Sequence, residues 1–222
     1  MVKNFINKTL ERWRRYHQIS EVGDITRRYF VMNAFDGALT MLGVIIGAYM
    51  AGILNPIPII SSGVAGSIAM GTSGFSGAYM TEKAERTKKL KELENAMLTD
   101  MSNGLHYKSY RFATIFAALV DGVSPALAAM LVVSPFFLVR LGLIEIINAF
   151  YFSIFLTLLS LLILGLYLAK ISNESMIKYG LQMLLVGVVT AILAFTTSIL
   201  LGGNVAYWIK IKDRKIYDII SF

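Results

Sequence analysis

The first long apolar run of the sequence contains one carboxylate. The run extends from about residue 29 to residue 54, and Asp36 lies among Ala, Phe, Leu, Ile, Val and Met residues. A charged side chain in the centre of a membrane helix costs roughly 2.5–3.5 kcal/mol on insertion scales. We therefore expect Asp36 to face protein, water or a cation rather than lipid, which makes it the first candidate for ion binding.

The second apolar run, at about residues 57–81, offers ligands that would complement a carboxylate. It contains Met70 close to three hydroxyl side chains, Thr72, Ser73 and Ser76. It is also rich in glycine, and small residues at three- or four-residue spacing let membrane helices approach closely. A carboxylate, a thioether and oxygen donors suit a borderline transition metal such as Fe²⁺ better than Mg²⁺ or Ca²⁺. The alternative is that Met70 fills space between helices, as methionine commonly does.

A second intramembrane acid follows in the third apolar run. Asp121-Gly122 repeats the dipeptide Asp36-Gly37, and a Gly-x-Tyr element ends both the second and the fourth runs. This pattern suggests two helical hairpins of the same orientation, and transporters place their sites where such repeats meet. Coincidence among apolar segments is the alternative. Asp121 is thus a possible second intramembrane ion site.

Acidic residues also follow the second apolar run. Glu82, Glu85 and Glu92 lie at helical spacing, so a metal ion could be collected between them. Arg86 and Lys89 stand four residues after Glu82 and Glu85, and such pairs are ordinary on a solvated helix. The segment is therefore either a metal-collecting surface or a helical stalk.

The composition is that of an integral membrane protein. Of the 222 residues, 56% are hydrophobic and 16% charged, whereas charged residues make up about a quarter of a soluble domain. Cysteine is absent, which excludes disulfides and thiolate sites. The sequence shows no nucleotide-binding loop, catalytic triad or zinc motif. We expect neither an enzyme, nor a permanently bound cofactor, nor a nucleic-acid partner.

The predicted fold is an all-α membrane protein with five transmembrane helices. An amphipathic N-terminal segment (1–28) precedes them, and a short helical extension of the second span forms a linker (82–111). Asn55-Pro56 makes a tight turn between the first two spans, and Pro125 predicts a kink or a break in the third. The spans are placed at residues 29–54, 57–81, 112–133, 146–169 and 179–201.

The distribution of basic residues predicts the orientation. Lys and Arg concentrate before the first span and in the linker, so the positive-inside rule places both in the cytoplasm. Five spans then put the C-terminal tail outside, although its four basic residues favour the inside. We expect a multi-pass protein of the cell membrane, or of a vacuolar-type membrane in a eukaryotic cell.

These motifs resemble those of the vacuolar iron transporter (nodulin-21-like) family of Fe²⁺/Mn²⁺ exporters. The resemblance rests on Asn33-Ala-Phe-Asp36-Gly37 in the first helix and on Ser67-Ile-Ala-Met70-Gly71 in the second. It implies a homodimer whose first two helices line a metal pathway, with Asp36 and Met70 as ligands and proton antiport as the driving process. The chain resembles a short prokaryotic-type member, because the family's large cytoplasmic metal-binding domain is much reduced here.

Two local departures accompany the resemblance. The signature reads Asn-Ala-Phe-Asp instead of Asn-Asp, and Gly74 stands where bacterial members often carry Glu. We expect a transporter that moves Fe²⁺ or Mn²⁺ out of the cytoplasm in exchange for protons, since a carboxylate in hydrocarbon can trade a proton for a cation. The alternatives are a non-transporting membrane scaffold or accessory subunit, and a transporter of another cation.

Overall fold

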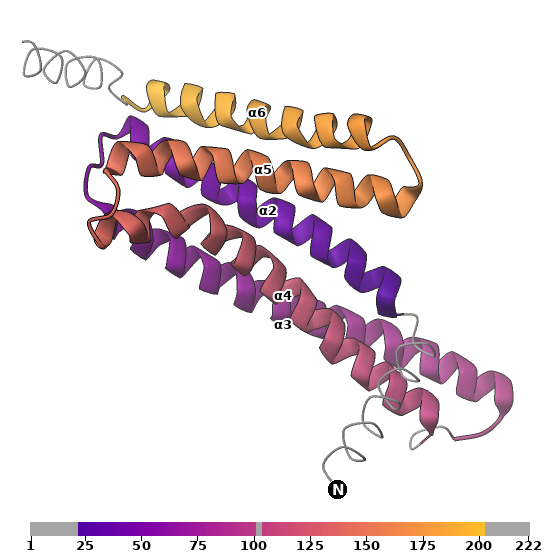
Figure 1. The fold of residues 1–222 in the computed structure, drawn as a ribbon. Helices are drawn as coiled ribbons and strands as arrows, with labels where there is room; N and C mark the ends of the chain where they lie inside the picture. The colour runs from indigo at the N-terminus through magenta and orange to yellow at the C-terminus, as the bar shows by residue number, and fades with distance from the viewer. Residues whose placement is uncertain (1–21, 101–103, 203–222) are drawn as a thin grey trace, which may run out of the picture. The chain divides into compact units, whose positions relative to one another are not determined.

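The protein is described by a computed structural model over residues 22–100 and 104–202. Throughout these residues the chain is helical and contains no strand, which confirms the all-α membrane fold. Most of the predicted segment 1–28 lies outside the described residues, and its last part, from Val22, belongs to the first helix (Figure 1). The helices are α2 (Val22–Met50), α3 (Pro56–Met97), α4 (Leu105–Arg140), α5 (Ile146–Ser172) and α6 (Met176–Leu200).

Four of the described helices, α2, α4, α5 and α6, are long and apolar enough to cross a membrane. The predicted second span, at residues 57–81, belongs to α3, which is not among them. The first half of α3 carries Gly, Ser and Thr where the other helices carry larger apolar side chains, and its second half is charged. Small and hydroxyl side chains suit contact between helices more than contact with lipid. A membrane crossing by α3 stays a prediction, whereas the predicted helical extension of this segment is confirmed, since α3 continues to Met97.

The chain divides into two compact units. Unit 1 comprises Met1–Ala34 and Ile68–Ala126, and unit 2 comprises Phe35–Ser67 and Leu127–Phe222. The boundaries fall inside α2, α3 and α4, so each of these helices contributes one part to each unit.

In unit 1, α3 and α4 run side by side and approach closely at glycines (Figure 1). A Cβ atom placed on Gly122 of α4 would lie 2.5 Å from the carbonyl oxygen of Gly71 and 2.9 Å from Cβ of Phe75. A real Cβ atom would not fit at these distances, so the helices meet at this separation because position 122 has no side chain.

A small apolar cluster joins the start of α2 to α4 within unit 1. Its centre is fully buried, and aromatic side chains that are partly buried surround it. Because two of its three central residues are alanines, the helix backbones come near one another and the rings close the rim. The central residues are Val22, Ala113 and Ala117, and the surrounding rings are Tyr29, Phe112 and Phe116.

Helix α4 continues without interruption through Pro125, so the alternative of a broken third helix is wrong. Proline removes one backbone donor, and membrane helices tolerate this loss where neighbouring groups satisfy the carbonyls that are left. The Ser124 hydroxyl donates a hydrogen bond to the carbonyl of Val120 in the turn before the proline. This hydrogen bond does not replace the bond lost at the proline, since the missing N–H of residue 125 would have donated to the carbonyl of Asp121.

In unit 2, residues 51–55 connect α2 to α3, so the connection is longer than the predicted two-residue turn at Asn55-Pro56. Pro56 is the first residue of α3, a position where its missing N–H costs nothing. The Asn55 side chain accepts a hydrogen bond of 3.0 Å from the backbone N–H of Ile57 and so satisfies one donor at the start of the helix. Further along α3, a Cβ atom on Gly63 would lie 2.5 Å from Val133, so this glycine again permits close packing.

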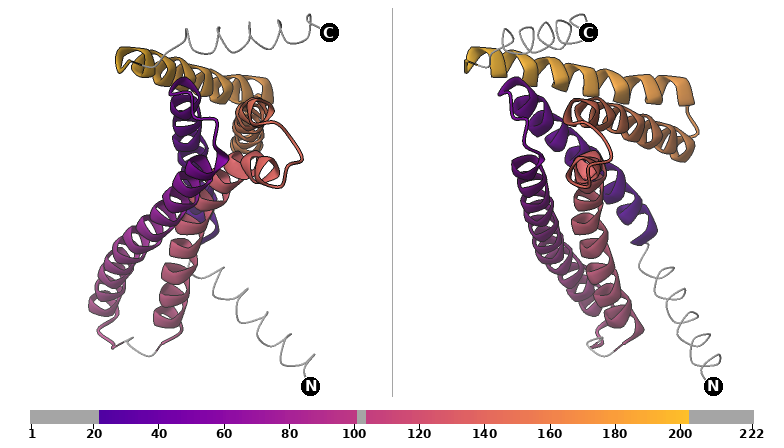
Figure 2. Two further views of the ribbon diagram at one scale, coloured as in Figure 1. Left: turned by 90° about the vertical axis from the view of Figure 1, so that its left-hand side faces the viewer. Right: turned by 60° about the vertical axis from the view of Figure 1, so that its left-hand side comes forward.

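The remaining part of unit 2 is an aromatic core and a helical hairpin. Phe150 of α5 contacts Phe136 and Tyr49 edge to face, with ring centroids 5.0 Å and 5.1 Å apart. Helices α5 and α6 lie side by side in every view (Figure 2), and Gly165 approaches Gly180 across their interface. The outer face of α6 is apolar and exposed, as expected of a helix that contacts lipid.

We predict that Gly122→Ala destabilises the protein by about 1–3 kcal/mol, because the added methyl group overpacks the contact between α3 and α4. Its melting temperature in detergent, followed by circular dichroism, should fall by several degrees. Gly77→Ala on α3 is the matched control, since nothing lies within 4 Å of its Cβ position and alanine favours a helix. Equal melting temperatures for the two variants would show that the glycine contact does not hold the helices.

Candidate functional site

Asp36 lies on α2 in unit 2, and its side chain is exposed. Thr40, Gly43 and Gly47 follow it at intervals of four, three and four residues, which places all four residues on one helix face. Nothing lies within 4 Å of the Cβ positions of Gly43 and Gly47, so this face of the helix is open. The carboxylate is therefore available at an uncovered face of an apolar helix.

The second predicted ligand of the transported ion, Met70, lies on α3 in unit 1 and is half-buried. Asp36 belongs to unit 2. The joint coordination of an ion by Asp36 and Met70 therefore stays a prediction.

The other intramembrane acid, Asp121, has a partner that sequence reasoning missed. The Asn33 amide donates a hydrogen bond of 2.6 Å to Oδ1 of Asp121, and it also donates one of 2.8 Å to the carbonyl of Tyr29. Gly74 brings α3 close to the same carboxylate, since a Cβ atom there would lie 3.1 Å from Oδ2 of Asp121. No local pattern connects Asn33 with Asp121, which follows it by 88 residues. Asp121 is thus held inside unit 1 by an amide.

Glu82, the first of the three predicted cytoplasmic ligands, takes part in a buried ion pair. Its Oε2 accepts a hydrogen bond of 2.9 Å from Nε of Arg86, and its Oε1 accepts one of 3.0 Å from the Tyr29 hydroxyl. The Glu82 and Arg86 side chains are only 5% and 8% exposed. The Arg86 guanidinium also lies 5.8 Å from the ring centre of Tyr110. Both carboxylate oxygens of Glu82 are therefore engaged, one by α2 and one by the next turn of α3.

Glu85 and Glu92 lie on the surface of α3 and pair with lysines. Lys89 lies 3.0 Å from Glu85, and Lys88 lies 3.9 Å from Glu92. The hydrogen bond from Lys89, together with its charge, holds the pKa of the Glu85 carboxyl below its usual value. Within residues 22–100 and 104–202, no three His, Asp or Glu side chains come together as a group that could hold a metal. A metal-collecting role for Glu82, Glu85 and Glu92 stays a prediction, and the pairs agree with the stalk alternative.

Comparison with known proteins adds two findings. A family model described as the VIT family matches residues 88–198. The uncharacterized protein MJ0645 of Methanocaldococcus jannaschii is 35% identical over 176 residues, which cover 78% of this chain and 88% of that protein.

The chain belongs to the VIT family. This confirms the resemblance to vacuolar iron transporters, and the archaeal relative fits a short prokaryotic-type member. A VIT protein is a membrane transporter for metals of the iron and manganese kind, which fits a protein that is not an enzyme. The matched residues begin within the charged part of α3 and include Asp121. Asp36 and Met70 precede the matched residues, so the family match does not assign a role to either side chain.

We predict that Arg86→Met costs about 3–5 kcal/mol of stability, because it leaves the buried Glu82 carboxylate without its guanidinium. Lys89→Met is the matched control: it removes a pair of the same spacing on the same helix, but an exposed one worth at most about 1 kcal/mol. Thermal unfolding in detergent measures both.

The double variant Glu82→Gln with Arg86→Met should recover part of the loss, since the stranded charge is gone. If Arg86→Met melts at the same temperature as Lys89→Met, the buried pair does not stabilise unit 1.

Proposed function

We propose that this VIT protein moves Fe²⁺ or Mn²⁺ out of the cytoplasm in exchange for protons, with Asp36 as the ligand that carries the ion. The observation that supports this most is the exposed carboxylate on an apolar helix. Such a group is costly in lipid, so it must meet water, a cation or another protein surface. Asp121 differs, because its carboxylate is already engaged by Asn33.

The face of α2 that bears Asp36 also supports a homodimer. Gly43 and Gly47 leave open space on this face, and small residues four apart let a second helix pack closely in a membrane. Packing of a second copy there would bring two Asp36 carboxylates to one interface. A doubly charged cation between them would compensate both negative charges. Asp36 is exposed in the single chain because, in this proposal, its partners are the cation and the second copy.

Met70 is the proposed source of metal selectivity. Its thioether is a soft donor, which Fe²⁺ accepts more readily than Mg²⁺ or Ca²⁺ do. Ser73 follows Met70 by three residues, so its hydroxyl lies on the same face of α3. Together with Asp36, these groups would form a mixed site for a borderline metal.

Proton exchange follows from the chemistry of a carboxylate ligand. A carboxyl group must lose its proton before it binds a metal ion, so metal entry releases a proton and metal departure allows one to return. We infer that the charged end of α3 lies in the cytoplasm, because the positive-inside rule favours that side for the basic linker and N-terminal segment. The metal would then travel from the cytoplasm to the other side while protons move inward.

We predict that Asp36→Asn lowers metal flux at least tenfold in proteoliposomes that contain a metal-quenched dye. The amide keeps the size of the side chain but cannot provide a negative charge. Asp24→Asn is the matched control, since Asp24 is a highly exposed acid at the start of the same helix, paired with Arg27. Undiminished flux in Asp36→Asn would contradict the proposal. A wild-type protein that moves neither metal under any pH gradient would instead favour the scaffold alternative.

We also predict that Met70→Leu keeps the fold, because the two side chains have similar volumes, but weakens discrimination against Ca²⁺. The measurement is inhibition of Mn²⁺ uptake by added Ca²⁺, which should become stronger by a fewfold. Met80→Leu is the control, since Met80 is 71% exposed on the same helix. Identical inhibition curves for wild type and Met70→Leu would assign Met70 to packing alone.

A further inference from the structure

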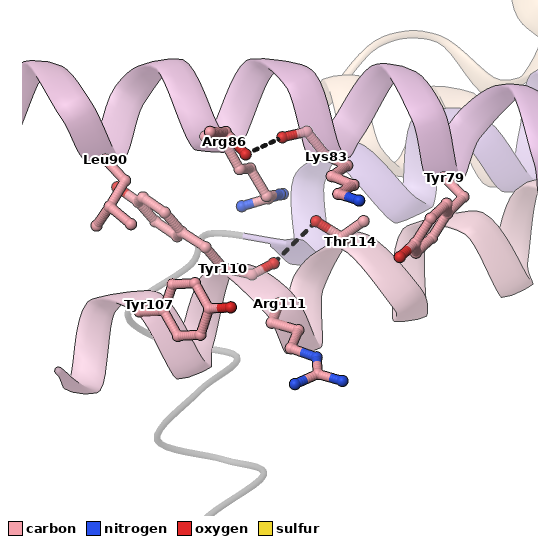
Figure 3. A pocket seen from close by; sticks show the side chains of 9 residues that line it. Tyr79, Lys83, Arg86, Leu90, Tyr107, Tyr110, Arg111 and Thr114 are labelled. Carbon is pink, nitrogen blue, oxygen red and sulfur yellow. Dashed lines mark hydrogen bonds between the residues drawn. The ribbon is translucent and has the colours of Figure 1, made fainter. Parts of the chain in front are cut away.

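A cavity of about 390 Å³ opens between α3 and α4 in unit 1, and its lining is strongly basic and aromatic (Figure 3). Its volume lies in the range of sites that hold small molecules. Figure 3 shows Lys83, Arg86 and Tyr110 in the space between the two helices, whereas the guanidinium of Arg111 extends from α4 away from α3. The cations are Lys83, Arg86 and Arg111, and the tyrosines are Tyr79, Tyr107 and Tyr110.

The charge of this cavity is not balanced by the residues around it. Glu82 compensates Arg86 through the buried ion pair. In the described part of the chain, no carboxylate forms an ion pair with Lys83 or with Arg111. Neither Glu85 nor Glu92 lines the cavity, and each pairs with a lysine outside it. Two positive charges therefore remain to attract an anion.

One of the cations is held in place before any ligand arrives. Arg86 is buried, bound to Glu82 at 2.9 Å and packed 5.8 Å from the ring centre of Tyr110. Because Arg86 is already fixed, its side chain loses no further conformational entropy when an anion enters. The exposed Lys83 and Arg111 side chains can move to close around the anion. Arginine and lysine together with tyrosine hydroxyls are the donors that phosphate oxygens accept.

The cavity lies where both helices change from apolar to charged. On α3, Glu82 is the first charged residue after the apolar stretch, and Lys83 directly follows it. On α4, Arg111 directly precedes Phe112 and the long apolar stretch. Lys, Arg and Tyr gather at this level of membrane proteins because it coincides with the lipid headgroups. Basic pockets between helices at this depth bind phosphate-bearing headgroups.

We propose that this cavity binds a phosphate group, carried by an anionic phospholipid headgroup or by a soluble phosphate compound. The bound anion compensates Lys83 and Arg111 and ties α3 to α4 at their charged ends. The site is separate from Asp36 and does not depend on metal transport, so the failure of either proposal leaves the other standing.

The test is a titration of the full-length protein in detergent, with the change in melting temperature as the readout. The probes are dioctanoyl phosphatidylglycerol, the zwitterionic dioctanoyl phosphatidylcholine, and inorganic phosphate. The double variant Lys83→Gln with Arg111→Gln should bind the anionic probe about 30-fold more weakly. Both residues are exposed, so the fold should persist, and an unchanged size-exclusion profile verifies this.

Lys91→Gln with Lys108→Gln is the matched control. It removes the same charge from the same two helices, but neither residue lines the cavity. Lys83→Arg with Arg111→Lys keeps the charge and should keep most of the binding.

The outcomes separate the two sources of phosphate. Saturable binding of phosphatidylglycerol alone assigns the site to a headgroup, and saturable binding of inorganic phosphate as well assigns it to a soluble compound. Either result supports the proposal if the cavity variant weakens binding and the control variant does not. The proposal is overturned if no probe saturates, if phosphatidylcholine binds as tightly as phosphatidylglycerol, or if both double variants weaken binding equally.

Discussion

The hydrogen bond between Asn33 and Asp121 shows the constraint under which unit 1 is built. A carboxylate inside an apolar helix needs a donor, and the Asn33 amide supplies it at 2.6 Å. The same region of α4 meets α3 at Gly74 and at the contact of Gly122 with Gly71. Close helix packing and the enclosure of this polar pair therefore depend on one another, because larger side chains at the glycines would hold α3 away from Asp121.

The acids of the described chain can be sorted by what engages them. Asp121 is engaged by an amide, Glu82 by a guanidinium and a phenol, and Glu85 by a lysine, so each has a structural partner. Asp36 is exposed on an open helix face in an apolar setting, which is the condition expected of a group that binds its partner only transiently. Asp36 is therefore distinguished as the proposed transport ligand by its exposure, because the other three acids are engaged by structural partners.

The sequence was sufficient for those features that depend on local patterns. The all-α fold and the ion pairs at four-residue spacing follow from composition and helix periodicity. The tight turn predicted at Asn55-Pro56 was too short, because α2 ends at Met50 and Pro56 already begins α3. Contacts between distant segments were not predictable: Tyr29 meets Glu82 across 53 residues, and the cavity cations come from two helices. The predicted break at Pro125 was wrong, since α4 continues through this residue. Membrane helices tolerate proline where the surrounding protein satisfies the freed carbonyl, and the local sequence does not reveal such groups.

Asp36 is the proposed ligand of the transported metal. The most direct test of this role is an anomalous difference map from crystals of the full-length protein grown with Mn²⁺. If Asp36 is the ligand, a peak is expected within about 2.5 Å of an Asp36 carboxylate oxygen, which is the length of a metal–oxygen bond. Peaks confined to the glutamates of α3, with none at Asp36, would contradict this role.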